Sequence, residues 1–273
     1  MKDTLVITGA AGQVASMVRP YLREAFALRL TDRDALREPA VAGETFVAAD
    51  LADQAQMAAL LEGAAGVLHL GGQSVEAGWD TVNAANIQGL YGLLEACRTA
   101  KVPRVVFASS NHAVGFYPRA RTIDQNARVR PDSLYGVSKA FGEALCALYA
   151  DKFGLRVMAI RIGNIAPKPL DRRRLAIWQH PEDLAALVTI GLTHPDVHNA
   201  LVYGVSDNAR SWWDNAAAEA LGYRPKHRAA DHEAAVLEAP EAEDPVGDVF
   251  QGGSFCSDGF IGDLSRTKAD ASR

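Results

Sequence analysis

The 273-residue sequence has few cysteines and no long apolar run. Its three cysteines, Cys97, Cys146 and Cys256, are widely spaced and form no CxxC pair, which argues against a disulfide framework. No apolar run approaches the roughly 18 residues of a membrane span. The first residues also lack the charge, apolar block and cleavage site of a signal peptide. We therefore expect no membrane partner and a cytoplasmic location.

An excess of positive charge is absent as well. The sequence has 28 basic and 33 acidic residues, which gives a net charge of −5. Because phosphate binding relies on clustered Lys and Arg, we expect no nucleic-acid partner. The seven histidines form no HxH or HExxH pattern, so the sequence predicts no metal site. Apolar residues make up 48% and charged residues 22%, as in a globular protein with a substantial core.

Short apolar segments alternate with longer amphipathic ones over most of the chain. Strands are predicted over residues 4–7, 28–30, 46–48, 66–70, 104–108, 156–161 and 201–203. Helices are predicted over residues 13–26, 53–61, 79–100, 133–153 and 181–192. Alternation of this kind, with nearly all-apolar strands, indicates a parallel sheet covered on both faces. The sequence therefore predicts an α/β fold, a Rossmann-type doubly wound parallel sheet with a small C-terminal lobe.

The regular alternation weakens after Gly163. We interpret residues 1–163 as a Rossmann base and residues 164–273 as a small substrate-binding lobe. One strand, at about 200–204, is expected to return from the lobe to the sheet. Residues 265–273 are expected to form a frayed tail, because chain ends without obvious contacts are poorly ordered.

A glycine turn follows the first predicted strand and opens the first helix. Gly9 permits a tight turn, Gly12 lets the backbone approach a pyrophosphate, and a small third residue lets the helix pack close to the strand. The phosphates would then accept hydrogen bonds from the helix N-terminus, at Gln13 and Val14. The third small position is Ala15 rather than Gly. Such a spacing alone is weak evidence, since any strand–turn–helix can contain two glycines.

An acidic residue in the right place strengthens the dinucleotide hypothesis. Asp32 ends the second strand, 23 residues beyond Gly9, where a carboxylate accepts hydrogen bonds from an adenosine ribose. Because it would repel a 2′-phosphate, NAD is favoured over NADP as cofactor, although Arg33 leaves NADP open. Asp50 and Leu51 close the third strand and could contact adenine, but an ordinary helix N-cap region explains them equally well. Residues 1–163 are thus the expected NAD-binding part.

A phenol and an ammonium lie one helical turn apart in the helix predicted over residues 133–153. Tyr135 and Lys139 share a helix face, and a neighbouring cation lowers a tyrosine pKa toward the range of a useful base. Ser109 and Ser110 follow the strand over residues 104–108, at the carboxyl end where open parallel sheets bind ligands. A hydroxyl there can hydrogen-bond a reacting carbonyl. The alternatives without catalysis are that Tyr135 and Lys139 are a pair on the surface of a helix and that Ser109 and Ser110 belong to a serine-rich turn.

Together these residues resemble the extended short-chain dehydrogenase/reductase superfamily. Further stretches resemble the bacterial uronate dehydrogenases, and the similarity runs from Leu5 to about Phe255. These stretches are His69–Gly72, Phe107–His112, Leu134–Lys139, Trp212–Asn215 and Phe250–Gly253. The resemblance implies that Ser110 acts with Tyr135 and that Leu70, Gly71, Tyr135 and Lys139 also contact NAD.

The resemblance also implies a substrate site. It assigns the binding of the uronate carboxylate to Arg173, with Arg172 and Arg174 as alternatives. The structural alternative is that the three arginines form a solvated basic cluster without a ligand. Ser74, Asn111 and His112 would contact sugar hydroxyls. Asn164 stands where the family is expected to have a small residue such as Ser, and its amide makes it a further substrate candidate. The small C-terminal lobe favours a bare monosaccharide over a nucleotide sugar.

These residues predict NAD-dependent oxidation of an aldohexuronate, glucuronate or galacturonate, at C1 to the aldarolactone. Tyr135 would take the proton of the C1 hydroxyl, Lys139 would hold the phenolate, and Ser110 would position the reacting oxygen. Two alternatives stay open: a sugar epimerase or dehydratase that retains NAD, and a non-catalytic dinucleotide sensor. The long helices over residues 79–100 and 133–153 suggest a homo-oligomer, because such helices often pair across a two-fold axis in this superfamily.

Overall fold

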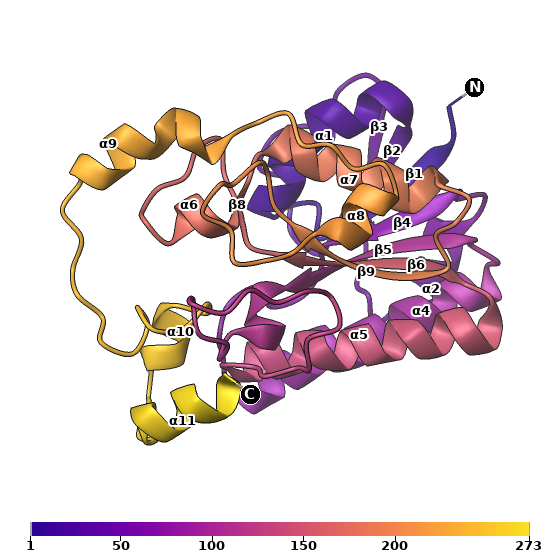
Figure 1. Cartoon of the computed structure of the whole chain (residues 1–273). Helices are drawn as coiled ribbons and strands as arrows, with labels where there is room; N and C mark the ends of the chain where they lie inside the picture. The colour runs from indigo at the N-terminus through magenta and orange to yellow at the C-terminus, as the bar shows by residue number, and fades with distance from the viewer. Residues whose placement is uncertain (1, 273) are drawn as a thin grey trace.

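The computed structural model describes residues 2–272, and seven parallel strands form its central sheet (Figure 1). The strand order is β3-β2-β1-β4-β5-β6-β9, and every neighbouring pair is parallel. The strands are β1 (Thr4–Thr8), β2 (Ala27–Asp32), β3 (Glu44–Ala48), β4 (Gly66–His69), β5 (Arg104–Ser110), β6 (Arg156–Ile162) and β9 (Asn199–Gly204). The order reverses between β1 and β4, where doubly wound sheets bind their ligands. The predicted α/β, Rossmann-type fold is confirmed.

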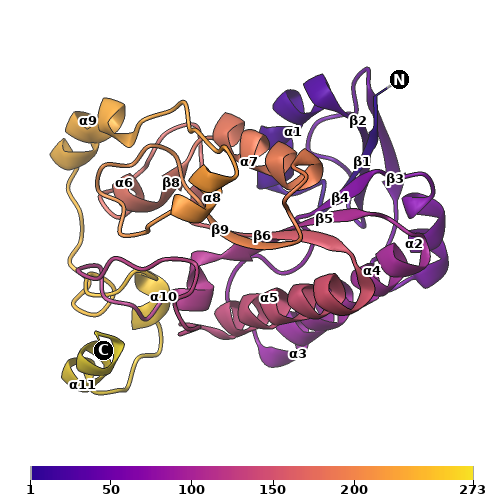
Figure 2. The same cartoon turned by 45° about the vertical axis from the view of Figure 1, so that its right-hand side comes forward.

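Helices cover both faces of this sheet (Figure 2). One face carries α1 (Gln13–Ala25) and α7 (Pro181–Thr193), and the other carries α2 (Gln54–Leu61), α4 (Gly89–Thr99) and α5 (Leu134–Phe153). Strand side chains alternate between the two layers: Ile7 packs with the first, and Val6 with the second. This burial of both faces explains why the strands are apolar at nearly every position.

The helix predicted over residues 79–100 contains an irregular turn. It consists of α3 (Trp79–Val82), a π-helical segment η1 (Asn83–Gln88) and α4. The irregular turn buries Asn86, whose amide bonds the backbone nitrogen and carbonyl of Gln73 at 2.7 and 3.0 Å and the Ser138 hydroxyl at 2.8 Å. Asn86 thus connects the loop after β4 to helix α5. Single π-turns inside helices often mark functional sites.

The chain after β6 contributes both to the sheet layers and to smaller structures. α7 and β9 belong to the main layers, while the remaining segments pack around buried tryptophans such as Trp178 and Trp213. These segments are β7 (Asn164–Ile165), β8 (Trp178–Gln179), α6 (Arg174–Ile177), α8 (Ala216–Ala220), η3 (Ala229–His232), α9 (Glu233–Glu238), α10 (Ser254–Ser257) and α11 (Leu264–Ala271). No helix within residues 2–272 has the length and apolar character needed to cross a bilayer.

The expectation of a frayed tail over residues 265–273 was wrong. Residues Leu264–Ala271 form helix α11. Asp263 caps its N-terminus, where the Asp263 side chain accepts a hydrogen bond from the Arg266 backbone nitrogen. At its other end, Arg121 donates to the carbonyl of Ala271 at 2.6 Å, and Ala271 is buried. The partner that orders this helix lies 150 residues away, so local sequence could not reveal it. Arg273 lies outside the described residues.

Candidate active site

The glycine turn lies at the bottom of a cleft of about 790 Å³. Gly9 has a φ of +70°, and a Cβ there would lie 2.6 Å from the Gly71 nitrogen and the Leu70 carbonyl carbon. Gly12 caps helix α1 without any side-chain hydrogen bond, and the first turn has no acidic residue. The helix therefore presents unpaired N–H groups to the cleft. This arrangement fits a pyrophosphate, since an anion satisfies both the donors and the helix dipole.

Asp32 lies at the end of β2 and faces the same turn. Its carboxylate accepts hydrogen bonds from the backbone nitrogens of Ala11 at 3.0 Å and Asp34 at 3.2 Å. These bonds hold the side chain against the cleft and leave lone pairs for a ribose. Arg33 also lines the cleft, and it is exposed.

The predicted cofactor residues from four segments meet in this one cleft. Its lining includes Gly9, Gly12, Gln13, Val14, Asp32, Asp50, Leu51, Leu70 and Gly71. Ser74 lies on the same lining, with its side chain exposed. The residues present are therefore those that a dinucleotide requires, at the switch point of the sheet.

Tyr135, Ser110 and Lys139 lie together beside the carboxyl ends of β5 and β6. Ser110 ends β5 and hydrogen-bonds the Tyr135 hydroxyl, and both side chains are buried. The Lys139 ammonium lies 5.4 Å from the centre of the Tyr135 ring and donates to the carbonyl of Ala108 at 2.9 Å. The three side chains that the sequence singled out thus share one site.

The electrostatics of this site differ from the expectation that Lys139 lowers the pKa of Tyr135. Burial raises the pKa of Tyr135 to about 12, against the lowering effect of its hydrogen bond with Ser110. Burial also lowers the pKa of Lys139 to about 8. Both pKa values shift toward the neutral form of the group because a dry pocket penalises charge. Desolvation, which sequence spacing does not report, therefore dominates in the pocket as it stands.

The two neighbouring serines have different surroundings. Ser109 donates to the Glu143 carboxylate at 2.6 Å, and Glu143 in turn pairs with Arg161. Ser110 faces Tyr135 and accepts a hydrogen bond from the His112 backbone nitrogen at 3.2 Å. Strand alternation explains the difference, because successive side chains point to opposite faces.

Of the three consecutive arginines, Arg173 faces this site. Arg172 is exposed and contacts Glu241 and the carbonyl of Leu237. Arg174 pairs with Asp171. Arg173 instead packs against Asn111; in the amide orientation that satisfies both neighbours, the Asn111 oxygen accepts from Arg173 Nη2 at 3.0 Å and its nitrogen donates to the carbonyl of Ile162 at 3.2 Å.

Burial lowers the pKa of Arg173 to about 10, with a further lowering by the charge of Arg119. Within residues 2–272, Arg173 forms no ion pair with a carboxylate. A desolvated guanidinium without an anionic partner is costly, which indicates a site prepared for an anion.

Two stretches singled out in the sequence, Trp212–Asn215 and Phe250–Gly253, hold Arg173 in place. Gln251 is completely buried, and its carbonyl accepts a hydrogen bond from Arg173 Nε at 2.9 Å. Its side chain accepts from the Trp213 indole at 2.8 Å and donates to the carbonyls of Pro118 and Arg121. The Trp-Trp-Asp-Asn and Phe-Gln-Gly-Gly stretches therefore meet behind the arginine.

Asn164 begins the short strand β7 just beyond β6. Its Oδ1 atom is buried without a hydrogen-bond partner within the described part of the chain. A buried acceptor of this kind requires a donor from a ligand or water. Asn164 is therefore a position where a bound molecule would complete the hydrogen bonding.

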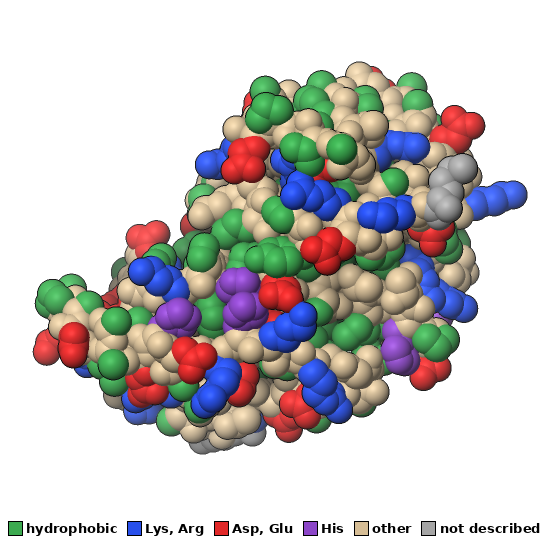
Figure 3. Space-filling view, turned by 90° about the horizontal axis from the view of Figure 1, so that it is seen from above, with side chains coloured by type: hydrophobic (Ala, Val, Ile, Leu, Met, Phe, Trp, Pro, Cys, Tyr) green, Lys and Arg blue, Asp and Glu red, His purple; other side chains and the backbone are tan. Residues whose placement is uncertain are grey.

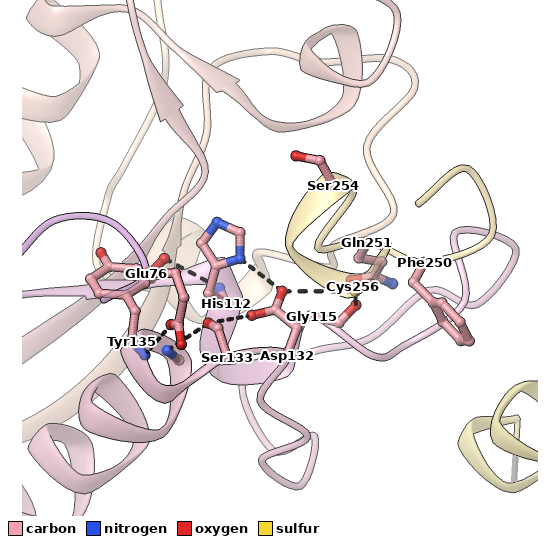
Figure 4. A network of polar contacts seen from close by, with 12 residues as sticks. Glu76, His112, Gly115, Asp132, Ser133, Tyr135, Phe250, Gln251, Ser254 and Cys256 are labelled. Carbon is pink, nitrogen blue, oxygen red and sulfur yellow. Dashed lines mark hydrogen bonds and ion pairs between the residues drawn. The ribbon is translucent and has the colours of Figure 1, made fainter. Parts of the chain in front are cut away.

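Several residues near the site were missed by sequence reasoning. The Glu76 carboxylate accepts from the backbone nitrogens of Leu134 and Tyr135 at the start of α5 (Figure 4). His112 is held by Asp132, which contacts its Nδ1 at 2.7 Å, and by Phe255, whose ring stacks on the imidazole with centroids 3.9 Å apart. Only Phe255 could have been found from the sequence, because it closely follows the Phe-Gln-Gly-Gly stretch. Glu76 and Asp132 meet their partners only in the folded structure.

The described residues also contain one cluster of His and Glu side chains that sequence patterns did not predict. His180, Glu182 and His227 bring one ligand atom each within 4.8 Å of one another, and Figure 3 shows histidines grouped on one face. The two imidazoles stack with centroids 3.5 Å apart, so their in-plane lone pairs do not converge on one point. The Lys226 ammonium pairs with Glu182 at 2.6 Å. This arrangement suits a surface ion pair better than a metal.

Comparison with known proteins agrees with this site. The model of the NAD dependent epimerase/dehydratase family matches residues 5–178. The uronate dehydrogenase of Pseudomonas syringae pv. tomato is 43% identical over 96% of this chain and 96% of its own. The crystal structure of glucuronic acid dehydrogenase from Chromohalobacter salexigens has a TM-score of 0.90 and 42% identity, covering 94% of this chain and 97% of that one.

A mutant uronate dehydrogenase from Agrobacterium tumefaciens, complexed with NAD, is similarly close. Its TM-score is 0.89 at 39% identity, and the match covers 94% of this chain and 98% of that one. The chain therefore belongs to the NAD dependent epimerase/dehydratase family, in the extended short-chain dehydrogenase/reductase superfamily, and within it to the uronate dehydrogenases.

Proposed function

We propose that this protein oxidises an aldohexuronate at C1, with NAD as the hydride acceptor, and releases an aldarolactone and NADH. The observation that carries the proposal is Arg173, a half-buried residue whose desolvated guanidinium has no carboxylate partner among the described residues and lies against Asn111, next in the chain to His112 beside Tyr135. A guanidinium binds a carboxylate through parallel, charge-assisted hydrogen bonds. A small sugar whose carboxylate occupies this position would extend its other end toward Tyr135.

The cofactor cleft supports the oxidative half of the proposal. Gly9, Gly12 and the free N–H groups of α1 would hold the pyrophosphate, and Asp32 would accept hydrogen bonds from the adenosine ribose. When bound, NAD supplies the acceptor for the hydride that leaves C1. The nearby His69 stays uncharged, because burial, with the charge of Lys139, lowers its pKa to about 3.

The protein's own residues manage the proton. Tyr135 takes the proton of the C1 hydroxyl as the C1–H bond breaks, and the C1–O bond becomes the lactone carbonyl. Ser110 donates a hydrogen bond that stabilises the phenolate, the form that burial otherwise disfavours. Lys139, held by the carbonyl of Ala108, lies beside this phenol, with its ammonium 5.4 Å from the centre of the Tyr135 ring. Asn111 bonds Arg173 and so keeps its guanidinium beside Tyr135 and Lys139.

Mixing the protein with NAD and glucuronate or galacturonate, and following NADH absorbance, tests the proposal. We expect one NADH per sugar oxidised and little activity with the matching uncharged hexoses. Replacing Tyr135 by Phe should remove most turnover, by a factor of about 10³, and leave NAD binding intact. Absence of NADH with every uronate rejects the proposal. Tightly retained NAD that is regenerated without net NADH would indicate an epimerase or dehydratase instead.

We also propose that the protein forms a homo-oligomer through helix α5. Leu134, Val137, Phe141 and Leu148 are 37–48% exposed, and their spacing places them along one side of the helix. Tyr91 on the neighbouring helix α4 is 54% exposed. Such a stripe is unfavourable in water unless another subunit covers it. Light scattering after gel filtration should give a multiple of the 29.2 kDa chain mass, and Phe141→Lys should shift it toward the monomer.

A further inference from the structure

We propose that Asp132 is a positioning residue that fixes the tautomer of His112, so that the His112 Nε2 atom accepts a hydrogen bond from the C2 hydroxyl of the sugar. Asp132 lies two residues before helix α5 and His112 follows β5. The Asp132 carboxylate contacts His112 Nδ1 at 2.7 Å. This inference rests on the proposed function, because it concerns the substrate of the same site.

Within residues 2–272, the side chains that bond the Asp132 carboxylate are hydrogen-bond donors. Its side chain is completely buried. One oxygen accepts from the Ser133 hydroxyl at 2.8 Å, and the other faces His112 Nδ1 and the Cys256 thiol, 3.8 Å away (Figure 4). A buried carboxylate needs a donor from each of these groups. The imidazole must therefore carry a proton on Nδ1, and in the neutral ring this leaves the lone pair on Nε2.

Two glycines make room for the carboxylate. A Cβ on Gly115 or on Gly252 would overlap Asp132 Oδ2. The backbone adds further restraint, because the Asp132 nitrogen donates to the carbonyl of His112 at 3.3 Å. The carboxylate therefore occupies a space beside His112 that is open only because both neighbouring positions are glycine.

The imidazole plane is restrained on both sides. Phe255 stacks on it at 3.9 Å, and the Tyr135 ring meets it edge-on at 5.8 Å between centroids. Figure 4 shows the second ring nitrogen of His112 turned away from Asp132. Because Tyr135 acts on the C1 hydroxyl, the neighbouring group with a proton to donate is the hydroxyl on C2, which we assign to His112; the ring oxygen on the other side of C1 has none.

A sugar needs acceptors in this pocket. Arg173 and Lys139 offer only donors, and the oxygen of the Asn111 amide is already used by Arg173, so a sugar depends on other acceptors, such as Asn164 Oδ1 and His112 Nε2. The lone pair of His112 Nε2 would take the proton of one sugar hydroxyl. With the opposite tautomer, His112 Nε2 would carry a proton and become a donor. The sugar hydroxyl would then have no acceptor for its own proton. In other enzymes, an Asp-to-Asn change beside a histidine removes activity through the wrong tautomer.

Nitrogen NMR of labelled histidine tests the tautomer directly. We expect the wild type to show the proton on Nδ1 of His112, and Asp132→Asn to move it to Nε2. Asp183→Asn is the matched control. The Asp183 carboxylate is equally buried and lies away from the site. It accepts hydrogen bonds from the Ser206 hydroxyl at 2.5 Å and from the Lys226 backbone nitrogen at 2.8 Å. A wild-type proton on Nε2, or the same tautomer in wild type and Asp132→Asn, overturns the proposal.

Kinetics with a uronate and its 2-deoxy analogue test the sugar contact. We expect Asp132→Asn to lower kcat/KM at least tenfold for the uronate and by less than about twofold for the analogue, which has no C2 hydroxyl to lose. Asp183→Asn should leave the ratio between the two sugars unchanged. Equal losses on both sugars overturn the C2 assignment. Should the wild type oxidise no uronate, the proposed function fails, while the NMR result still decides whether Asp132 sets the tautomer.

Discussion

The Nε atom of Arg173 donates to the main-chain carbonyl of Gln251, 2.9 Å away. This bond fixes the plane of a buried guanidinium and leaves its Nη atoms for Asn111 and for a ligand. Gln251 comes from the C-terminal segment, 78 residues further along the chain. The anion site therefore exists only when this segment is folded against the loop before α6.

Arg173→Lys should lower kcat/KM for a uronate about 100-fold, mainly through a higher KM. A lysine lacks the planar fork that binds both carboxylate oxygens and has no group to keep the bond with Gln251 in the same geometry. Steady-state kinetics with glucuronate and galacturonate measure the effect. NAD affinity, followed by titration, should not change.

Arg172→Lys is the matched control for this change. Arg172 is exposed and paired with Glu241, outside the site. Its replacement should leave both kinetic constants within about twofold, as for most surface substitutions. A larger loss with Arg172→Lys than with Arg173→Lys would contradict the assignment of the carboxylate to Arg173.

Two adjacent serines allow a second matched comparison. Ser110→Ala should lower kcat about 100-fold, because it removes the hydrogen bond to Tyr135 where charge develops. Ser109→Ala should lower the free energy of unfolding by about 1–2 kcal/mol instead, since it deletes a buried donor to Glu143, and should keep activity within a few-fold. Kinetics and urea unfolding of both variants separate the two roles. The reverse pattern would show that the serine assignment is wrong.

Lys139→Met should inactivate the enzyme and make it more stable at neutral pH. Burial lowers the pKa of Lys139 from 10.5 to about 8, so the folded state disfavours the charged amine. A shift of this size corresponds to about 3 kcal/mol, of which about 1 kcal/mol is offset by the lost bond to Ala108. We therefore expect a gain of about 2 kcal/mol at pH 7.

The pH dependence of this gain follows from the direction of the shift. Below about pH 8 the amine is charged in both states, and the wild type bears the full cost. Between about pH 8 and 10.5 the folded state loses the proton first, so wild-type stability rises relative to Lys139→Met. Urea unfolding at pH 7 and pH 9.5 should show the gap between the two proteins narrowing. A gap that stays constant would contradict a buried, desolvated lysine.

Asp32→Ser should reduce the preference for NAD over NADP at least tenfold. The carboxylate is held toward the cleft by Ala11, and it would repel a 2′-phosphate, whereas serine would not. The ratio of kcat/KM for the two cofactors measures the change. Arg33, exposed on the same cleft, is then available to the phosphate, and Arg33→Ala in the Asp32→Ser background should remove the gain with NADP.

The features that local sequence could predict are those that depend on local physics. Strand–helix alternation, the glycine turn and Asp32 follow from chain geometry within a few dozen residues, and all of them lie where they were expected. Tyr135 and Lys139 lie on one helical turn, so their proximity was also predictable. Their pKa values were not, because desolvation depends on every segment that closes the pocket.

The missed features depend on contacts between distant segments. Asp132 is an ordinary pre-helix carboxylate until Cys256, 124 residues away, and His112 enclose it. Helix α11 is ordered by Arg121, and Asn86 is buried by a π-turn that periodicity cannot distinguish from regular helix. Sequence pattern finds groups that chemistry requires, whereas their positioning partners come from the folded structure.

The glycines on either side of Asp132 have an evolutionary consequence. A side chain at Gly115 or Gly252 would overlap the carboxylate, so neither glycine can change while the aspartate remains. Shortening the aspartate would make space for one of them but would leave His112 without its partner. The three positions are therefore epistatic: a side chain at either glycine is compatible with the fold only when Asp132 changes as well.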